Sequence, residues 1–121
     1  MNNMKLISII MCNDMHMDIE RVNELISHIH CNKNYKIICD YTKADLVIII
    51  TCAFGEGRKN SMYKIADVQK NAKQSSKIIV TGCLVSTNKE ELEKIEGIVI
   101  KKFEDLKKFF IKNTSDKEIC Y

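Results

Sequence analysis

The chain has 121 residues, the length of a single domain. Hydrophobic residues make up 45% of it and charged residues 29%, a balance typical of a folded globular protein and not of a disordered one. The 19 Lys and Arg residues against 16 Asp and Glu residues give a net charge of +3, and this small, scattered excess does not indicate a nucleic-acid surface.

Neither a membrane anchor nor a secretory signal is indicated by the apolar runs. None of them approaches the ~18 residues of a membrane-spanning helix. The short apolar run after Lys5 ends at Cys12, which does not match a signal peptide. We therefore expect a cytoplasmic protein without a membrane partner. In that reducing compartment the six cysteines should be buried residues, metal ligands or reactive thiols, not a disulfide framework.

Apolar strands alternate with amphipathic helices along the chain. The predicted strands cover residues 5–11, 36–40, 46–51, 77–81 and 97–100. The predicted helices place the following residues inward: Ile19, Val22, Leu25, Ile26 and Ile29; then Met62, Ile65, Ala66 and Ala72 within residues 60–73; then Leu92 and Ile95 after a capping box at Thr87–Glu90; and last Phe103, Leu106, Phe109 and Phe110. Residues 1–112 should form one domain and residues 113–121 a flexible tail.

This order of elements predicts an α/β fold. We expect an open, mostly parallel five-stranded sheet in the flavodoxin-like order 2-1-3-4-5, with helices on both faces. Residues 46–51 are apolar and β-branched almost throughout, as in a central parallel strand. The link over residues 41–45 is too short for a helical crossover. Either residues 36–40 form a poor edge strand, or this link is a compact loop.

Three cysteines occupy the same kind of position. Cys12 follows the first strand, Cys52 follows the third, and Cys83 follows the fourth after one glycine. The carboxyl ends of parallel strands share one edge, and neighbouring strands lie about 4.8 Å apart, so the three sulfurs should lie within several ångströms of one another. Open α/β sheets bind ligands at this edge. Three thiolates without an evident fourth ligand suit a [4Fe–4S] cluster with one open iron.

The cysteines also allow a zinc site or a purely structural role. Zinc suits them less well, because structural zinc takes four ligands, usually in C-x-x-C pairs, and the sequence has no such pair. Any single cysteine is more often a small buried residue than a ligand. We expect that structural role for Cys31, at a helix end, and for Cys39, inside the second strand. Cys120, in the tail, is expected to be an exposed cysteine without a functional role.

Three segments resemble the motifs of one enzyme family. Residues 12–21 resemble its first cysteine followed by D-x-E-R, residues 44–53 resemble its A-D-hydrophobic-N-T-C-A segment, and residues 78–84 resemble its V-T-G-C segment. From about Lys5 to about Ile111 the chain thus resembles the N-terminal domain of the radical SAM methylthiotransferases. Enzymes of that family thiomethylate tRNA bases or a ribosomal protein.

The resemblance implies a cofactor and its ligands. In the family the three motif cysteines hold an auxiliary [4Fe–4S] cluster that is thought to deliver sulfur. The same roles are therefore implied for Cys12, Cys52 and Cys83. The match also implies that Arg21 or Asp18 helps to shape the site.

The chain departs from the family pattern at several points. Met11 stands in place of a glycine, and Met15 and Ile50 stand in place of asparagines, which removes polar groups near the cluster. The sequence has no C-x3-C-x2-C triplet to hold a SAM-cleaving cluster and no RNA-binding domain. We therefore expect it to need a separate radical SAM protein in trans, and to meet a tRNA or protein substrate only through that partner.

Two further functions fit the same residues. One is a cluster-free thiol module of flavodoxin-like fold, acting in redox switching, persulfide relay or partner docking. The second is an interaction scaffold that has lost its chemistry, which the loss of both motif asparagines favours.

Overall fold

The computed structural model describes residues 5–12, 19–52 and 56–112. Its strands are β1 (Lys5–Met11), β2 (Tyr35–Ile37), β3 (Leu46–Thr51), β4 (Lys77–Gly82) and β5 (Ile98–Ile100). Its helices are α1 (Ile19–Cys31), the 3-10 turn η2 (Tyr41–Lys43), α2 (Gly57–Asn71), α3 (Cys83–Thr87), α4 (Lys89–Glu93) and α5 (Phe103–Lys112). The predictions for Met15, Asp18 and Cys120 fall outside the described residues.

The five strands form one parallel sheet in the order β2-β1-β3-β4-β5, which confirms the predicted topology. All six residues of β3 are buried, as its apolar sequence predicts for a central strand. The strand is flanked by β1, where Met11 pairs with Ile50, and by β4, where Gly82 pairs with Thr51.

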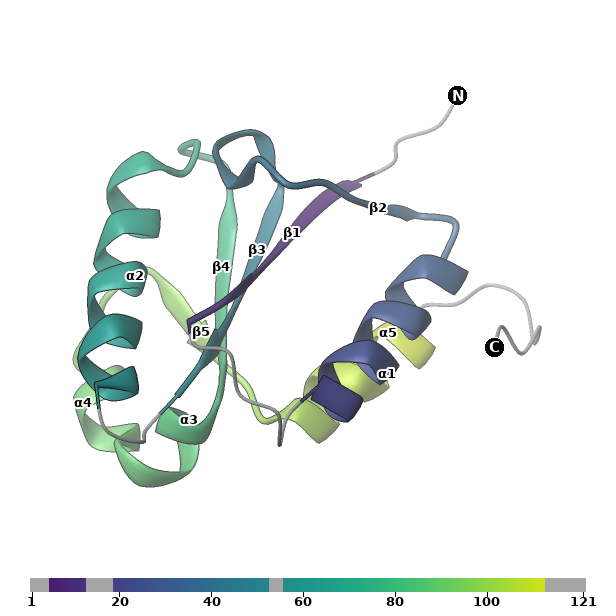
Figure 1. Ribbon diagram of the computed structural model, residues 1–121. Helices are drawn as coiled ribbons and strands as arrows, with labels where there is room; N and C mark the ends of the chain where they lie inside the picture. Colours follow the sequence, from purple (N-terminus) through teal and green to yellow (C-terminus); the bar gives the residue numbers. More distant parts are fainter. Residues whose placement is uncertain (1–4, 13–18, 53–55, 113–121) are drawn as a thin grey trace.

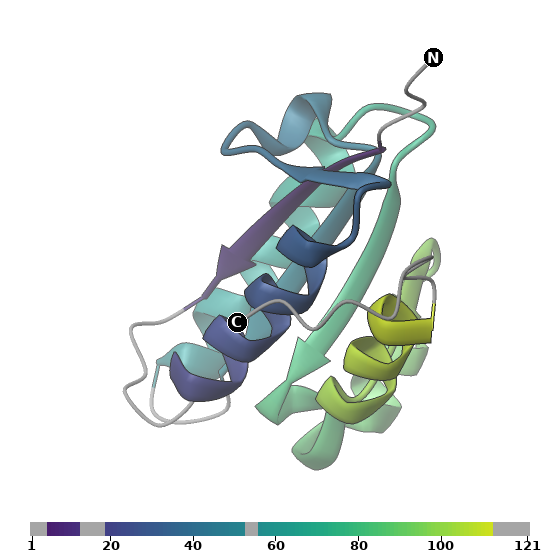
Figure 2. The same ribbon diagram turned by 90° about the vertical axis from the view of Figure 1, so that its right-hand side faces the viewer.

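Helices cover both faces of the sheet (Figure 1). On one face α1 and α5 pack against each other and against the sheet, enclosing a core that contains Leu25, Ile48 and Phe110. Figure 2 shows these two helices in front of the strands. On the other face α2, α3 and α4 enclose a second core that contains Val47, Ile65 and Leu92. The sheet therefore separates two apolar layers, both of which depend on β3.

The second strand is short, and the link that follows it is compact, as the two alternatives for this region predict. β2 has only three residues and lies at the edge of the sheet. The Asp40 carboxylate begins the link by accepting hydrogen bonds from the Thr42 amide, at 3.0 Å, and from the Thr42 hydroxyl, at 2.6 Å. The 3-10 turn η2 then carries the chain into β3, so no crossover helix is needed.

The helical predictions need three corrections. α2 begins at Gly57, earlier than expected, and buries Val68, while Ala66, which we expected inward, is exposed. In α5 the buried residues are Leu106 and Phe110, which are four positions apart and so share one face of the helix. Phe109, which we also expected inward, lies on the side of the helix and is 40% exposed. Its ring meets that of Phe110 edge-on, with the centroids 5.3 Å apart.

The third correction concerns the capping box. Thr87 does not open a helix; it is the last residue of the short helix α3, which we did not predict. Its hydroxyl contacts the Cys83 carbonyl oxygen at 3.1 Å and the Asn88 Oδ1 atom at 2.7 Å instead of capping α4. α4 starts at Lys89 with Asn88 as its N-cap residue, and Leu92 on this helix is buried as expected.

Within the described residues there is no helix with the length and apolar character required to span a membrane.

Candidate metal centre

The sheet brings Cys12, Cys52 and Cys83 to one edge. Each directly follows the last residue of its strand, and the three strands β1, β3 and β4 are neighbours. The Cys12 amide continues the ladder by donating to the Ile50 carbonyl oxygen at 3.0 Å, which places Cys12 level with Thr51. Cys52 and Cys83 follow the paired residues Thr51 and Gly82 and so lie one step further along the same edge.

Cys12 and Cys52 lie close enough for their charges to interact. Burial of the Cys12 thiol raises its pKa above the ordinary value of 9.0. A hydrogen bond with the Ser61 hydroxyl and the charge of Lys64 act in the opposite direction, whereas a charge on Cys52 adds to the increase of the pKa. At neutral pH Cys12 is therefore held as a neutral thiol, which loses its proton when a metal binds it.

Ser61 of α2 fixes the backbone of Cys52. Its hydroxyl accepts a hydrogen bond from the Cys52 amide at 2.9 Å and donates to the Cys52 carbonyl oxygen at 3.2 Å. Both residues are buried, with Cys52 only 2% exposed. A buried backbone amide that lost this bond would be left unsatisfied. The serine thus holds the end of β3 against α2.

Gly82 allows β4 to end close against β3. Its φ is +99°, and a Cβ atom at this position would lie 2.5 Å from the Thr51 carbonyl oxygen, so only glycine fits. The Thr51 hydroxyl crosses to the neighbouring strand, donating to the Thr81 carbonyl oxygen at 2.7 Å and accepting from the Leu84 amide at 3.1 Å. Together these contacts fix the position of Cys83, the first residue of α3.

A cleft of about 740 Å³ opens beside Cys83, between α1, α3 and the start of α5. Its charged lining residues are Arg21, Glu24, Lys102, Glu104 and Lys107, and its apolar ones include Leu25, Val85 and Phe103. Lys107 forms an ion pair with Glu24 that joins α5 to α1 and lowers the pKa of the Glu24 carboxyl. The cleft gives one of the three cysteines access to solvent-borne ligands.

The side chains as placed do not gather around one point. Cys12 packs against the core on the α2 side, while Cys83 lines the cleft on the side of α1 and α5. In the part of the chain that is described, no three His, Cys, Asp or Glu side chains are grouped so that they could hold a metal ion. A shared metal group would therefore need the thiols to turn toward the sheet edge between them.

Two features of this edge fit a sulfur-rich group. The Thr81 hydroxyl is fully buried and has no hydrogen-bond partner among the described residues. The close contact of Gly82 with the Thr51 backbone fixes the strand end from which Cys83 follows at this edge. With three thiols at one edge, the residues present fit a group bound through three cysteines, although the ligand set is not preassembled.

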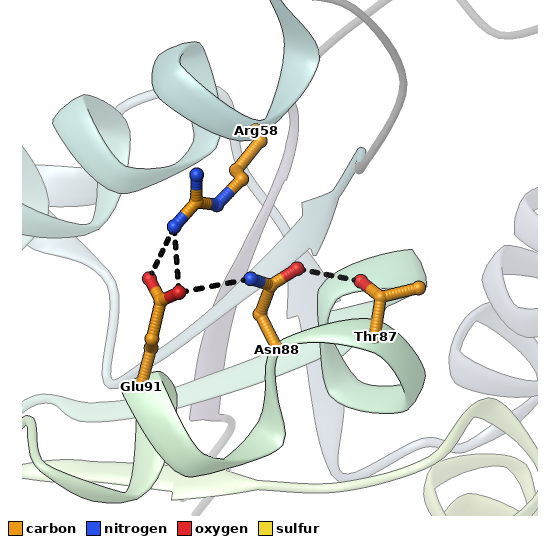
Figure 3. Close-up of polar contacts among 4 residues, drawn as sticks. All are labelled: Arg58, Thr87, Asn88 and Glu91. Carbon is orange, nitrogen blue, oxygen red and sulfur yellow. Dashed lines mark hydrogen bonds and ion pairs between the residues drawn. The ribbon is translucent and has the colours of Figure 1, made fainter.

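A polar network lies beside the cysteine-bearing edge (Figure 3). One guanidinium nitrogen of Arg58, in the first turn of α2, donates to both carboxylate oxygens of Glu91 in α4, at 2.6 and 2.7 Å. The Asn88 amide donates to the same carboxylate at 3.0 Å, and the Thr87 hydroxyl links Asn88 to the carbonyl oxygen of Cys83. The network joins the start of α2 to the helices that follow Cys83.

The sequence predicted some of the residues that line or support the candidate site and missed others. Arg21, implied by the family resemblance, does line the cleft. Asp45, in the second motif, lies at the opposite end of β3, where it accepts a hydrogen bond from the Leu6 amide at 2.8 Å. Ser61 was missed because nothing in the sequence distinguishes it. Thr51 and Thr81 lie within the quoted motifs, so those segments could have drawn attention to them.

The structure also gives the positions of two further cysteines and of two residues that differ from the family pattern. Cys31 ends α1 as expected. The prediction for Cys39 is wrong, because β2 ends at Ile37 and leaves Cys39 exposed. Met11, which replaces a glycine of the family pattern, is 37% exposed, and Ile50, which replaces an asparagine, is buried in the core under α1 and α5.

Comparison with known proteins gives one family match. The sequence model of the family described as "Uncharacterized protein family UPF0004" matches residues 7–101. Curated relatives include proteins named ribosomal protein uS12 methylthiotransferase RimO. The one from Campylobacter jejuni (strain 81-176) is 35% identical and covers 53% of this chain and 18% of its own length. The one from Clostridioides difficile (strain 630) is 36% identical, covering 58% and 16%.

A third relative, from Hydrogenobaculum sp. (strain Y04AAS1), carries the same name and is 34% identical, covering 68% of this chain and 20% of its own. The chain therefore spans no more than about a fifth of these relatives, and the match falls on their N-terminal region. No solved structure matches the chain significantly.

Proposed function

Because this chain belongs to the family UPF0004, whose domain forms the N-terminal part of methylthiotransferases, we propose that it is a [4Fe–4S] module of a methylthiotransferase system. In this proposal Cys12, Cys52 and Cys83 bind the cluster and leave one iron open. The observation that carries it is the placement of three cysteines at the carboxyl ends of three adjacent parallel strands.

When bound, the cluster would supply an open iron at which an exogenous sulfur ligand is held. The chain would contribute the surroundings. Ser61 and Thr51 hold the backbone at Cys52 and at α3, and the burial of Cys52 keeps water away from that thiolate. The cleft beside Cys83 gives a route to the site, and Arg21 and Lys102 make part of its lining cationic.

Anaerobic reconstitution with iron and sulfide tests the ligand assignment. The wild-type chain should take up close to four irons and four sulfides per chain, with a broad visible absorption. Cys12→Ser, Cys52→Ser and Cys83→Ser should each take up much less iron or lose it on desalting. Cys39→Ser is the matched control, because Cys39 is an exposed thiol away from the edge, and it should load like the wild type. Full loading of all three edge variants would overturn the proposal.

The partner and substrate form a second part of the proposal. We propose that a separate radical SAM protein acts with the cluster in trans; the curated relatives that match the chain over about a fifth of their own length are named for the modification of ribosomal protein uS12. A tRNA or protein substrate would be reached only through that partner, in the cytoplasm. Adding the loaded chain to a radical SAM methylthiotransferase that lacks its own N-terminal domain should restore methylthio product, measured by mass spectrometry; no product would overturn this part.

A cluster-free dithiol function is the second candidate. It is favoured by the placement of Cys12 near Cys52, close enough for the charges of the two thiols to interact. This function predicts a colourless protein that does not take up iron and whose Cys12 and Cys52 titrate together with a dithiol redox buffer. The iron content of the reconstituted wild type therefore separates the two candidates.

A further inference from the structure

Thr81 is an unusual residue at the end of β4. Its side chain is fully buried, and its hydroxyl oxygen has no hydrogen-bond partner within residues 5–12, 19–52 and 56–112. A buried hydroxyl without a partner is unfavourable, and valine would fill the same space without that cost. Thr51, one position further along β3 than the register partner of Thr81, shows the ordinary situation, because its buried hydroxyl both donates and accepts a hydrogen bond.

The alternation of side chains along β4 places Thr81 on the side of the sheet that Cys83 faces. Ile79, two residues earlier, and Ile50, its register partner on β3, both belong to the core under α1 and α5. Cys83, two residues later, lines the cleft on that same side. The Thr81 hydroxyl therefore lies beneath the part of the chain that would carry one of the cluster ligands.

We propose that the Thr81 hydroxyl donates a hydrogen bond to a sulfur atom of the bound cluster or of its Cys83 ligand. This inference rests on the proposed function and adds a positioning residue to it. Hydrogen bonds to the sulfurs favour the more negatively charged, reduced cluster and so raise its reduction potential. In the cluster-free chain the same hydroxyl has no hydrogen bond. It should therefore destabilise the cluster-free fold but stabilise the reduced cluster in the loaded chain.

The experiment compares Thr81→Val and Thr81→Ser with the wild type, with and without cluster. In the cluster-free chain Thr81→Val should melt at the same temperature as the wild type or above it, because an unsatisfied hydroxyl has been removed. In the loaded chain it should shift the reduction equilibrium toward the oxidised form about tenfold, or ~59 mV for one electron. Resonance Raman bands of the iron–sulfur bonds should shift with it. Thr81→Ser keeps a hydroxyl and should restore the wild-type potential.

Thr51→Val is the matched control for stability. It is the same substitution at the register-adjacent strand end, but it removes a hydroxyl that bonds Thr81 and Leu84, so it should lower the melting temperature of the cluster-free chain. If Thr81→Val loads four irons and keeps the wild-type potential and Raman bands, the inference is overturned and the proposed function stands. If the wild type takes up no iron, the proposed function itself fails.

Discussion

Gly82 lies beside Thr51 across the β3–β4 ladder, so close that a methyl group on Gly82 would lie 2.5 Å from the Thr51 carbonyl oxygen and 2.7 Å from its amide nitrogen. Both of those atoms belong to the backbone and cannot turn away. The position of Cys83 therefore depends on a contact that no larger residue permits, and the stability of the cysteine-bearing edge should be sensitive to it.

Gly82→Ala should be strongly destabilising. Its φ of +99° alone would cost an alanine roughly 1–3 kcal/mol of strain, and the backbone clash should take the loss in the free energy of unfolding beyond that range. Gly97→Ala is the control, because Gly97 has a φ of +86° but its nearest neighbour to an added Cβ is a side-chain nitrogen of Gln69 at 3.8 Å. Urea denaturation should rank Gly82→Ala as clearly the worse of the two; equal losses would contradict the close-contact argument.

Ser61→Ala should loosen the end of β3. The substitution leaves the buried Cys52 amide without its hydrogen bond, at a cost of roughly 1–3 kcal/mol in the free energy of unfolding. It should also weaken iron uptake, because the backbone that carries Cys52 would no longer be held against α2. Ser86→Ala, at an exposed serine of α3, should change the unfolding free energy very little. Chemical denaturation and iron content measured on both variants would show whether the two effects occur together.

Cys12 should alkylate slowly in the cluster-free chain. Its pKa is raised above 9.0, chiefly by burial, so the thiolate fraction at pH 8 is smaller than that of an ordinary cysteine. The rate of iodoacetamide labelling at Cys12 should keep increasing with pH above 9. Exposed Cys39 serves as the internal reference for reagent access. Peptide mass spectrometry that found Cys12 labelled as fast as Cys39 at pH 8 would be the contrary result.

Asp45 should stabilise the fold at neutral pH and not in acid. Hydrogen bonds from the Leu6 amide and from Lys73 lower the pKa of its carboxyl below the usual 3.8. A depressed pKa contributes stability that is present above pH 3.8 and is lost as the pH falls through the folded-state value. Asp45→Asn should therefore be less stable than the wild type at pH 7, and the difference should shrink toward pH 2.

Lys73→Met separates the two partners of Asp45, because it removes the ion pair and leaves the bond from Leu6 in place. Its loss at pH 7 should be the smaller one. A difference between Asp45→Asn and the wild type that stayed constant from pH 7 to pH 2 would contradict the role assigned to the carboxylate.

The Arg58–Glu91 pair should matter little for stability. Both side chains are about half exposed, so water and salt screen their attraction. Glu91→Gln should have a small effect on thermal melting at low ionic strength, and that effect should disappear in about 1 M salt. Asn88→Ala removes the next member of the network and gives an independent comparison. A large, salt-insensitive loss for Glu91→Gln would show that the network holds α2 and α4 together.

Strands were easier to predict from the sequence than short helices, for physical reasons. β3 and β4 are runs of apolar residues in a parallel sheet, so burial on both faces is reflected directly in their composition. α3 has five residues, two of them β-branched, and its position depends on Gly82 and on the Thr51 hydroxyl, which are contacts made across the sheet. Thr87 matched a capping box because the sequence cannot show that its hydroxyl contacts the Cys83 carbonyl oxygen and the Asn88 side chain.

The candidate site was predictable at the level of the backbone. Counting residues to the strand ends was enough to bring Cys12, Cys52 and Cys83 to one edge, because the sheet order fixes which ends are adjacent. The direction of each thiol was not predictable in this way. It depends on Ser61, on the conformation of Gly82 and on packing against helices that approach from either side.

The sheet keeps the surroundings of Cys12 and Cys83 apart, one in the layer of α2 and the other beside α1 and α5. A group bound by both cysteines would cross the end of the sheet and link the two helical layers to each other. Loss of that group would remove the link, so removal of iron by a chelator should increase the rate of proteolysis in both layers together.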